Sequence, residues 1–152
     1  MSFNPKLELT QNEKVQLRRA KIKISEVHTY SGEELAQILG ISDDRARTVK
    51  ALAEFQKVPS IGYELAEKLV HRLDIYSLKE LKDQNGAELL DELEQRLGVW
   101  TDPCVEDQIR CVVYFANDPS SSKKWFDFTK ERKDYRTKIG YPENRPKKAW
   151  YE

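Results

Sequence analysis

The sequence contains no apolar run long enough to span a membrane, and its N-terminus lacks the apolar stretch of a signal peptide. Apolar residues make up 39% of the chain and charged residues 34%, which is typical of a surface-rich protein without a membrane partner. We therefore expect a cytoplasmic location. With 152 residues, the chain is long enough to bury a core, and we expect one domain carrying a tail.

The sequence is also poor in cysteine, with only Cys104 and Cys111. We expect both in one helix, where seven residues at about 1.5 Å each place their Cα atoms about 10 Å apart, too far for a disulfide. His28 and His71 are distant in sequence, so no metal-ligand cluster is formed. We expect two free thiols, no metal and no cofactor.

The alternation of apolar and polar residues that is typical of strands is missing over any useful length, whereas helical spacing recurs nearly throughout. Thr10, Ser31 with Glu34, Asp102-Pro103 and Asp118-Pro119 are predicted helix starts. The sequence therefore predicts an all-α protein. We divide it into an N-terminal helical extension (1–30), a central region (31–100) and a C-terminal helical segment with a basic tail (101–152), packed as one domain with the central region.

The chain has no net charge, yet its charges are unevenly distributed. Residues 1–122 hold 16 basic and 21 acidic residues, a net charge of −5, and residues 123–152 hold 10 and 5, a net charge of +5. Such a basic tail either contacts an anion or folds back on the acidic body.

Aromatic residues are interleaved with the basic residues of this tail. Helical spacing of Trp125, Phe128, Arg132 and Tyr135 favours a helix that packs its aromatics on the body and leaves the tail lysines for phosphates. We expect the last stretch of the chain to be irregular and docked through Trp150 and Tyr151.

The segment KVPSIGYELAEKLV, residues 57–70, joins two predicted helices through a tight turn. The first amides of the second helix are unpaired there, and together with the helix dipole they can hold a phosphate. Glycine at position 62 permits a close backbone approach, and the small Ala66 lets the two helices pack tightly.

The residues Val58-Pro59-Ser60-Ile61-Gly62, with Ala66, resemble the helix-hairpin-helix motif, which commonly shows Leu-Pro-Gly-Ile-Gly and an alanine four residues after the second glycine. The resemblance implies a compact helix-hairpin-helix (SAM-like) fold that binds DNA or RNA backbones without reading sequence. The nucleic-acid contacts would then be Lys57, Pro59, Ser60, Ile61, Gly62 and Lys68.

Two residues depart from the motif. Ser60 stands where glycine is usual and constrains the turn, and Glu64 stands where phosphate-binding members often carry Lys or Arg. A carboxylate there opposes a phosphate by about 1 kcal/mol, and its spacing from Lys68 favours a helix-surface ion pair. Two functions stay open: DNA binding without sequence preference, and a protein–protein interaction adaptor in which the hairpin is only structural.

A second candidate turn, ILGISDDRA at Ile38–Ala46, aligns with VPSIGYELA twenty residues later. It fits a second hairpin of the same kind. It also resembles a helix-turn-helix, whose second helix would present Ser42, Asp43, Arg45, Arg47 and Lys50 to a major groove. We favour a third interpretation, in which Ser42 simply caps a helix and the two aspartates complement its dipole.

Three longer segments occur in an order similar to that of the bacterial pathogenicity-locus family, whose members are often labelled mitomycin resistance proteins. They are LAEFQKVPSIGYELAEKLV, SLKELKDQNGAELLDELEQRLG and DPCVEDQIRCVVYFA. The resemblance implies a bacterial, cytoplasmic helix-hairpin-helix protein associated with DNA damage or drug resistance.

No motif predicts an enzyme. Helix-hairpin-helix glycosylases carry a catalytic aspartate about twenty residues beyond the hairpin, and Asp83 lies near that distance. However, Asp83 falls in LKDQNG, which predicts a helix end on an acidic surface, and neither cysteine has a partner base at a recognisable spacing. We therefore expect no catalytic residues.

Overall fold

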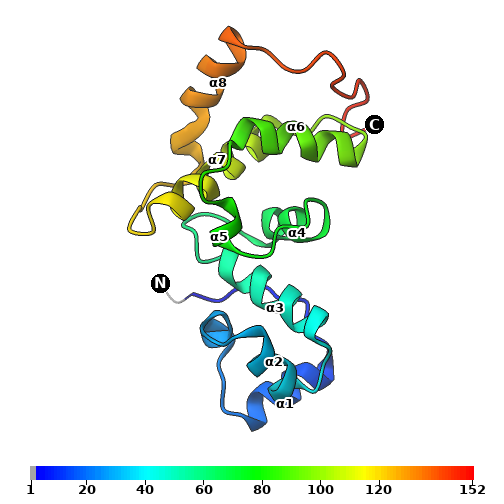
Figure 1. Cartoon of the computed structure of the whole chain (residues 1–152), viewed down its shortest axis with the longest axis vertical. Coiled ribbons are helices and arrows are strands. Elements are labelled where there is room, and N and C mark those ends of the chain that lie inside the picture. Colours follow the sequence, from blue (N-terminus) through cyan, green and yellow to red (C-terminus); the bar gives the residue numbers. More distant parts are fainter. Residues whose placement is uncertain (1–2) are drawn as a thin grey trace.

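The computed structural model describes residues 3–152, and within them the regular structure is helical (Figure 1). An isolated β-bridge pairs Trp100 with Ala149. The all-α prediction is therefore confirmed for the described residues. The elements are α1 (Gln11–Arg19), η1 (Ile24–Thr29), α2 (Gly32–Leu39), α3 (Asp43–Phe55), α4 (Tyr63–His71), α5 (Leu78–Leu81), α6 (Gly86–Leu97), α7 (Pro103–Asn117), η2 (Trp125–Phe128) and α8 (Thr129–Lys138).

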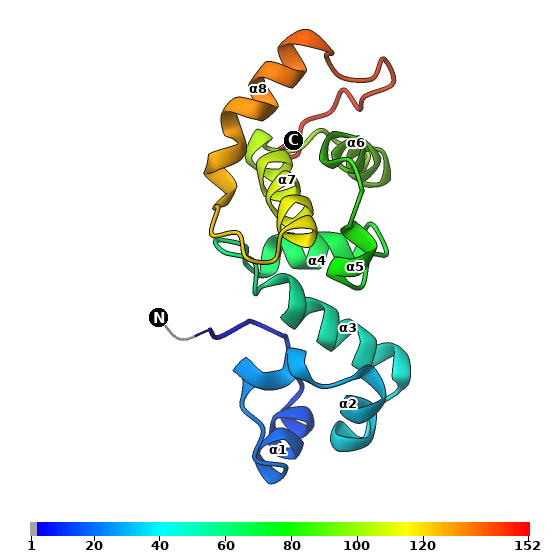
Figure 2. The same cartoon turned by 60° about the vertical axis from the view of Figure 1, so that its left-hand side comes forward.

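Helix α3 lies in the middle of the molecule and joins two groups of helices (Figure 2). Helix α2 and η1 pack on α3, and α1 packs on α2. Helix α4 follows α3, and α7 packs against α4, α5, α6, η2 and α8. Because one cluster of buried apolar side chains runs from Leu7 to Phe128, the two groups share a single core.

Capping side chains fix most of the helix starts. Ser31 forms the predicted capping box with Glu34, and Thr10, predicted only as a helix start, forms a capping box with Glu13. Asp102 accepts from the amide of Cys104, with Pro103 at the first helical position. Asp118-Pro119 starts no helix, contrary to our prediction: Asp118 binds Ser120 in a turn, and the next helical residues begin at Trp125.

The chain begins with an extended segment that lies against the end of α3. The side-chain amide of Gln56 accepts from the Lys6 amide at 3.0 Å and donates to the Lys6 carbonyl at 2.8 Å. Pro5 and Leu7 are buried there. The predicted extension over residues 1–30 thus contains α1 and η1 but starts without a helix, and residues 1–2 lie outside the described part.

The C-terminal stretch is irregular and is docked mainly by its backbone. Trp100 donates to the Lys148 carbonyl, and Trp150 donates to the Trp100 carbonyl, both at 2.9 Å, while the small Ala149 between them is buried. Trp150 and Tyr151 take part in this docking, since the Tyr151 ring also lies edge-on to the Trp100 ring with centroids 5.8 Å apart, but their side chains remain 53% and 67% exposed. None of the helices described in residues 3–152 has the length and apolarity needed to cross a bilayer.

Candidate functional site

The turn after α3 buries its apolar side chains and exposes its polar positions. Val58 and Ile61 are buried, because the backbone folds them inward through bonds from the Val58 amide to Phe55 and from the Ile61 amide to Val58. Ser60 and Gly62 are exposed, and Pro59 is half-buried. Of the predicted contact residues in this turn, Ile61 therefore serves the core, and Ser60 and Gly62 face solvent.

Ser60 adopts the left-handed conformation that favours glycine, with φ of +69°. The glycine usual at this position would adopt that conformation without strain, so the serine in this sequence makes the turn less favourable. The hydroxyl oxygen of Ser60 accepts a hydrogen bond of 2.9 Å from the amide of Trp125. Ser60 therefore ties the turn to the start of the basic tail.

Gly62 precedes α4 with an ordinary φ of −109°, and no side chain caps this helix. Helices α1, α2, α3, α5, α6 and α7 each carry a side-chain cap. The carboxylate of Glu64 lies beside this start, since its Oε2 is 3.6 Å from where a Cβ on Gly62 would stand. The positive end of the α4 dipole is thus open to solvent but has a carboxylate next to it.

The two predicted lysines differ in their surroundings. Lys57 is exposed at the turn, whereas Lys68 is half-buried further along α4 and donates to the Glu64 carbonyl at 3.5 Å. The expected ion pair between Lys68 and the Glu64 carboxylate is not found among the described residues. Burial, followed by the charges of Lys57 and Lys50, lowers the pKa of His28 below its ordinary value of 6.5.

The backbone of the tail reaches the same turn, although the ammonium group of Lys123 lies over the Tyr114 ring, 4.4 Å from its centroid. The amide of Trp125 is bonded to Ser60, so the exposed Lys123 and Lys124 immediately precede that contact. Cys111 lies beneath, with its Sγ 3.9 Å from the Pro59 carbonyl oxygen and 3.6 Å from that of Lys123. We call Lys57, Ser60, Gly62, Lys123 and Lys124 the turn surface.

A hollow of about 400 Å³ lies at the turn surface. One side is formed by residues 56–62 and the other by the N-terminal segment from Phe3 to Pro5. The extended N-terminal segment therefore contributes to the site, although the motif itself contains no signal for it.

The second candidate turn shares some backbone features with the first, although the Ile41 amide bonds to the Ala36 carbonyl, whereas the Ile61 amide bonds to that of Val58. Gly40, which aligns with Ser60, has a φ of +65°, and Ser42, which aligns with Gly62, starts the next helix. Ala46 and Ala66 are both completely buried. Unlike Gly62, Ser42 caps its helix by accepting from the Arg45 amide at 3.1 Å, the interpretation that we favoured.

The cations of α3 are engaged within the protein. Arg45 bonds both carboxylate oxygens of the buried Glu13, and Lys50 donates to the His28 and Tyr30 carbonyls. Arg47 lies over the Tyr76 ring at 3.9 Å. Because these contacts hold the side chains against the body, the arrangement disfavours a helix-turn-helix in which α3 reads bases.

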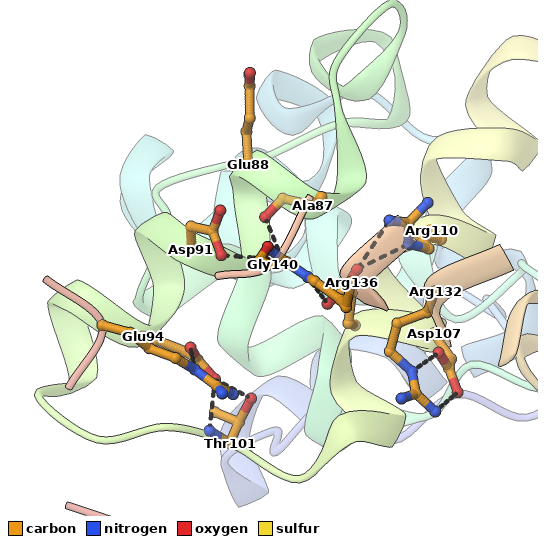
Figure 3. A network of polar contacts seen from close by, with 12 residues as sticks. Ala87, Glu88, Asp91, Glu94, Thr101, Asp107, Arg110, Arg132, Arg136 and Gly140 are labelled. Carbon is orange, nitrogen blue, oxygen red and sulfur yellow. Dashed lines mark hydrogen bonds and ion pairs between the residues drawn. The ribbon is translucent and has the colours of Figure 1, made fainter. Parts of the chain in front are cut away.

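The tail folds back on the acidic body through its arginines (Figure 3). Arg132 binds the buried Asp107 at 2.6 Å, and Arg145 binds the buried Glu94 at 2.7 Å. Arg136 contacts the buried Glu106 at 2.9 Å and Asp91 at 3.0 Å. The seven tail lysines, by contrast, are all exposed: Lys123, Lys124, Lys130, Lys133, Lys138, Lys147 and Lys148.

The aromatic residues of the tail stabilise this arrangement. Phe128 is buried in the core, which confirms that the tail packs on the body. Arg145 stacks over the Tyr141 ring at 3.6 Å, and Arg136 stacks over the same ring at 4.1 Å. Phe128 and Tyr141 therefore serve packing and arginine stacking, whereas Phe126 remains 54% exposed.

Within residues 3–152, no group of three potential ligands is placed to hold a metal ion. Burial raises the pKa of Cys111 to about 11, and burial also raises that of Cys104. Both thiols are free and stay protonated at neutral pH. Asp83 is exposed at the end of the α5 segment, with its amide bonded to Asn117.

Comparison with known families agrees with the order of segments in the sequence. The model of the pathogenicity locus family matches residues 48–134, which is more than half of the chain. The chain belongs to the pathogenicity locus family. No curated protein and no solved structure matches it.

The match to the pathogenicity locus family covers the turn surface completely and extends into α8. It includes the ion pair between Asp107 and Arg132 but ends before Arg136 and Arg145. Helices α1 and α2 also lie outside it. The matched segment therefore comprises the α3–α4 turn and the first part of the tail that is docked on it.

Proposed function

We propose that the α3–α4 unit is a helix-hairpin-helix that binds the phosphate backbone of nucleic acid, DNA above all, without reading sequence. The observation that carries the proposal is the bond between Ser60 and Trp125, which joins Lys123 and Lys124 to the turn. The exposed Lys57 and Lys124 therefore belong to two segments, distant in sequence, that meet at this turn, next to the start of α4, which lacks a side-chain cap.

The chemistry of these groups fits a phosphate. Lys57 and Lys124 are exposed and stand in none of the protein's ion pairs between described residues. The first amides of α4 present donors and the positive end of a dipole. A backbone phosphate needs no more than donors and cations, and the sequence of the bases plays no part in such contacts.

One observation favours a second function, that of a protein-interaction adaptor. The Glu64 carboxylate lies beside the start of α4, where it repels an approaching phosphate. In the adaptor, the turn only connects helices. A role in the response to DNA damage or mitomycin would follow from the first function and not from the second.

The test is fluorescence anisotropy with labelled duplex and single-stranded oligonucleotides, titrated from low to physiological salt. We expect affinity to fall linearly on a log–log salt plot. The Lys57→Glu/Lys124→Glu variant should bind weakly, with a salt slope shallower by about two and an unchanged melting temperature. Unchanged binding by this variant would exclude the turn surface as the contact.

The matched control is Lys14→Glu/Arg18→Glu, which changes the net charge equally but lies on α1, outside the turn surface. It should retain most of the oligonucleotide affinity. If both variants lose affinity to the same extent, net charge alone explains the binding. If the wild-type protein binds no oligonucleotide even at low salt, the adaptor function replaces nucleic-acid binding.

A further inference from the structure

Helix α1 and the turn after it carry a dense set of unneutralised cations. Lys14, Arg18, Arg19, Lys21 and Lys23 are all exposed, and within residues 3–152 none of them forms an ion pair. The acidic residue of α1, Glu13, is buried and bound by Arg45. Residues 11–23 thus hold five basic residues and one acidic residue, a local net charge of +4 within the acidic body.

These cations surround an apolar hollow. Its volume is about 300 Å³, and it is lined by Leu17, Ile22 and Ile24 together with Lys14 and Arg18. Leu17 and Ile22 belong to the buried core, so the floor of the hollow is fixed, whereas both charged residues are exposed at its rim. We call this hollow the α1 groove.

The α1 groove continues toward the N-terminal segment. A second hollow of about 350 Å³ shares Lys14 and Ile24 with it and is bordered by residues 4–9. The Gln56 side chain is hydrogen-bonded to both the amide and the carbonyl of Lys6, and these bonds fix the position of this border. Together the two hollows can accommodate several residues of an extended or helical peptide.

We propose that the α1 groove docks an acidic segment of a protein partner. An apolar side chain of the partner fills the hollow over Leu17, Ile22 and Ile24, and carboxylates beside it pair with Lys14 and Arg18. The charge complementarity and the apolar floor favour this partner together. A nucleic-acid duplex would use the cations but keeps its bases stacked and so has no apolar side group to place in the hollow.

The proposal does not depend on nucleic-acid binding at the turn surface, because it uses different residues. It also extends beyond the pathogenicity locus match, which begins after α1 at residue 48. The α1 groove and the turn surface belong to different elements: the groove lies at α1, and the turn surface lies at the turn between α3 and α4 (Figure 2).

The experiment is selection of random twelve-residue peptides displayed on phage against the full-length protein. We expect selected peptides to share one aliphatic or aromatic residue flanked by Asp or Glu. Synthetic copies should bind Lys14→Glu/Arg18→Glu at least about tenfold more weakly than the wild-type protein. Lys57→Glu/Lys124→Glu, which has the same net charge, should bind them as the wild type does.

A second variant tests the hollow separately from the charges. Ile24→Ser should weaken binding of the selected peptides while leaving the melting temperature near that of the wild-type protein, because Ile24 is half-buried at the edge of the core. A peptide whose apolar anchor is replaced by serine should lose affinity for the wild-type protein as well. If neither change weakens binding, no side chain occupies the hollow.

Three other outcomes would overturn the proposal. One is that selection enriches no acidic–apolar motif. Another is that the selected peptides bind both charge-reversed variants equally. The third is that Lys14→Glu/Arg18→Glu loses oligonucleotide binding while keeping peptide binding, which would make the α1 groove a phosphate contact.

Discussion

The amide of Trp125 donates a hydrogen bond of 2.9 Å to the hydroxyl oxygen of Ser60, across 65 residues of sequence. Ser60 has a φ of +69°, so the residue in the least favourable backbone conformation of the turn is also the one that holds the tail. A glycine would adopt this conformation freely but could not accept the bond. The strain at Ser60 is therefore offset by a contact that only a side chain provides.

This relationship predicts different effects for two substitutions at position 60. Ser60→Ala keeps the left-handed strain and removes the hydrogen bond, and should lower the free energy of unfolding by about 1 kcal/mol. Ser60→Gly also removes the bond but relieves the strain, and should be more stable than Ser60→Ala by about 1 kcal/mol. Urea denaturation of the three proteins measures both differences.

Hydrogen exchange at the Trp125 amide is the control for this prediction. Both variants should exchange that amide faster than the wild-type protein, because each lacks its acceptor. Equal stability of the Ala and Gly variants would show that the conformation of residue 60 carries no strain.

Arg136 is predicted to be essential for stability. Its side chain is 7% exposed and binds Glu106, which is fully buried, as well as Asp91 and two carbonyls. Arg136→Ala leaves the Glu106 carboxylate with one fewer cation in the interior and should destabilise the protein by about 3 kcal/mol or more. Thermal unfolding followed by circular dichroism provides the measurement.

Lys133→Ala is the matched control for Arg136→Ala, since Lys133 lies on the same helix, is exposed and forms no ion pair among the described residues. It should change the free energy of unfolding by less than about 0.5 kcal/mol. Arg136→Lys should rescue little, because an ammonium group cannot bond both carboxylates and both carbonyls in the same geometry. A stable alanine variant would show that the buried contacts of Arg136 contribute little to the free energy of unfolding.

Cys111 should be unreactive in the folded protein. Burial raises its pKa to about 11, so the thiolate is scarce at pH 8 and the sulfur is also inaccessible. We expect iodoacetamide to modify Cys111 only at the rate of unfolding. Mass spectrometry of peptides after timed alkylation distinguishes labelling of Cys111 from labelling of the half-buried Cys104, whose pKa is raised too. Rapid labelling of Cys111 would contradict its burial.

His28 should make the protein less stable at mildly acidic pH. Its folded-state pKa lies below 6.5, first because of burial and then because of Lys57 and Lys50, although Glu54 acts in the opposite direction. The unfolded chain therefore binds a proton more readily than the folded one. Stability from this group is complete above pH 6.5 and is lost as the pH falls toward the folded-state pKa.

The measurement for His28 compares melting temperatures between pH 7.5 and pH 5 for the wild-type protein and His28→Phe, which keeps an aromatic ring but cannot be protonated. The variant should show the smaller decrease over that interval. His71→Phe, at an exposed position, should decrease as the wild-type protein does. Identical curves for all three would show that His28 titrates normally.

Local rules account for the part of the structure that the sequence revealed. The caps at Thr10, Ser31 and Asp102 were predictable because each acts within three residues of itself. The same rules failed at Asp118, where an aspartate followed by proline suits a turn as well as a helix start. The sequence placed Pro59 and Ile61 in the turn, but it did not predict that Pro59 is half-buried and Ile61 is buried.

The long-range ion pairs could not be predicted in the same way. Arg145 meets Glu94 across 51 residues, and Arg136 meets Glu106 across 30. With 26 basic and 26 acidic residues in the chain, composition does not indicate which of them pair. The charge asymmetry did indicate that the tail could return to the acidic body, and the structure confirms that it does.

The tail divides its cations by residue type, because its three arginines are committed to buried carboxylates and its seven lysines remain in solvent. Acetylation of a lysine, or its replacement by a neutral residue, would therefore alter the electric field outside the protein without removing any buried ion pair. The surface potential of this face can thus be adjusted stepwise, by modification or by evolutionary drift, while the architecture beneath it stays the same.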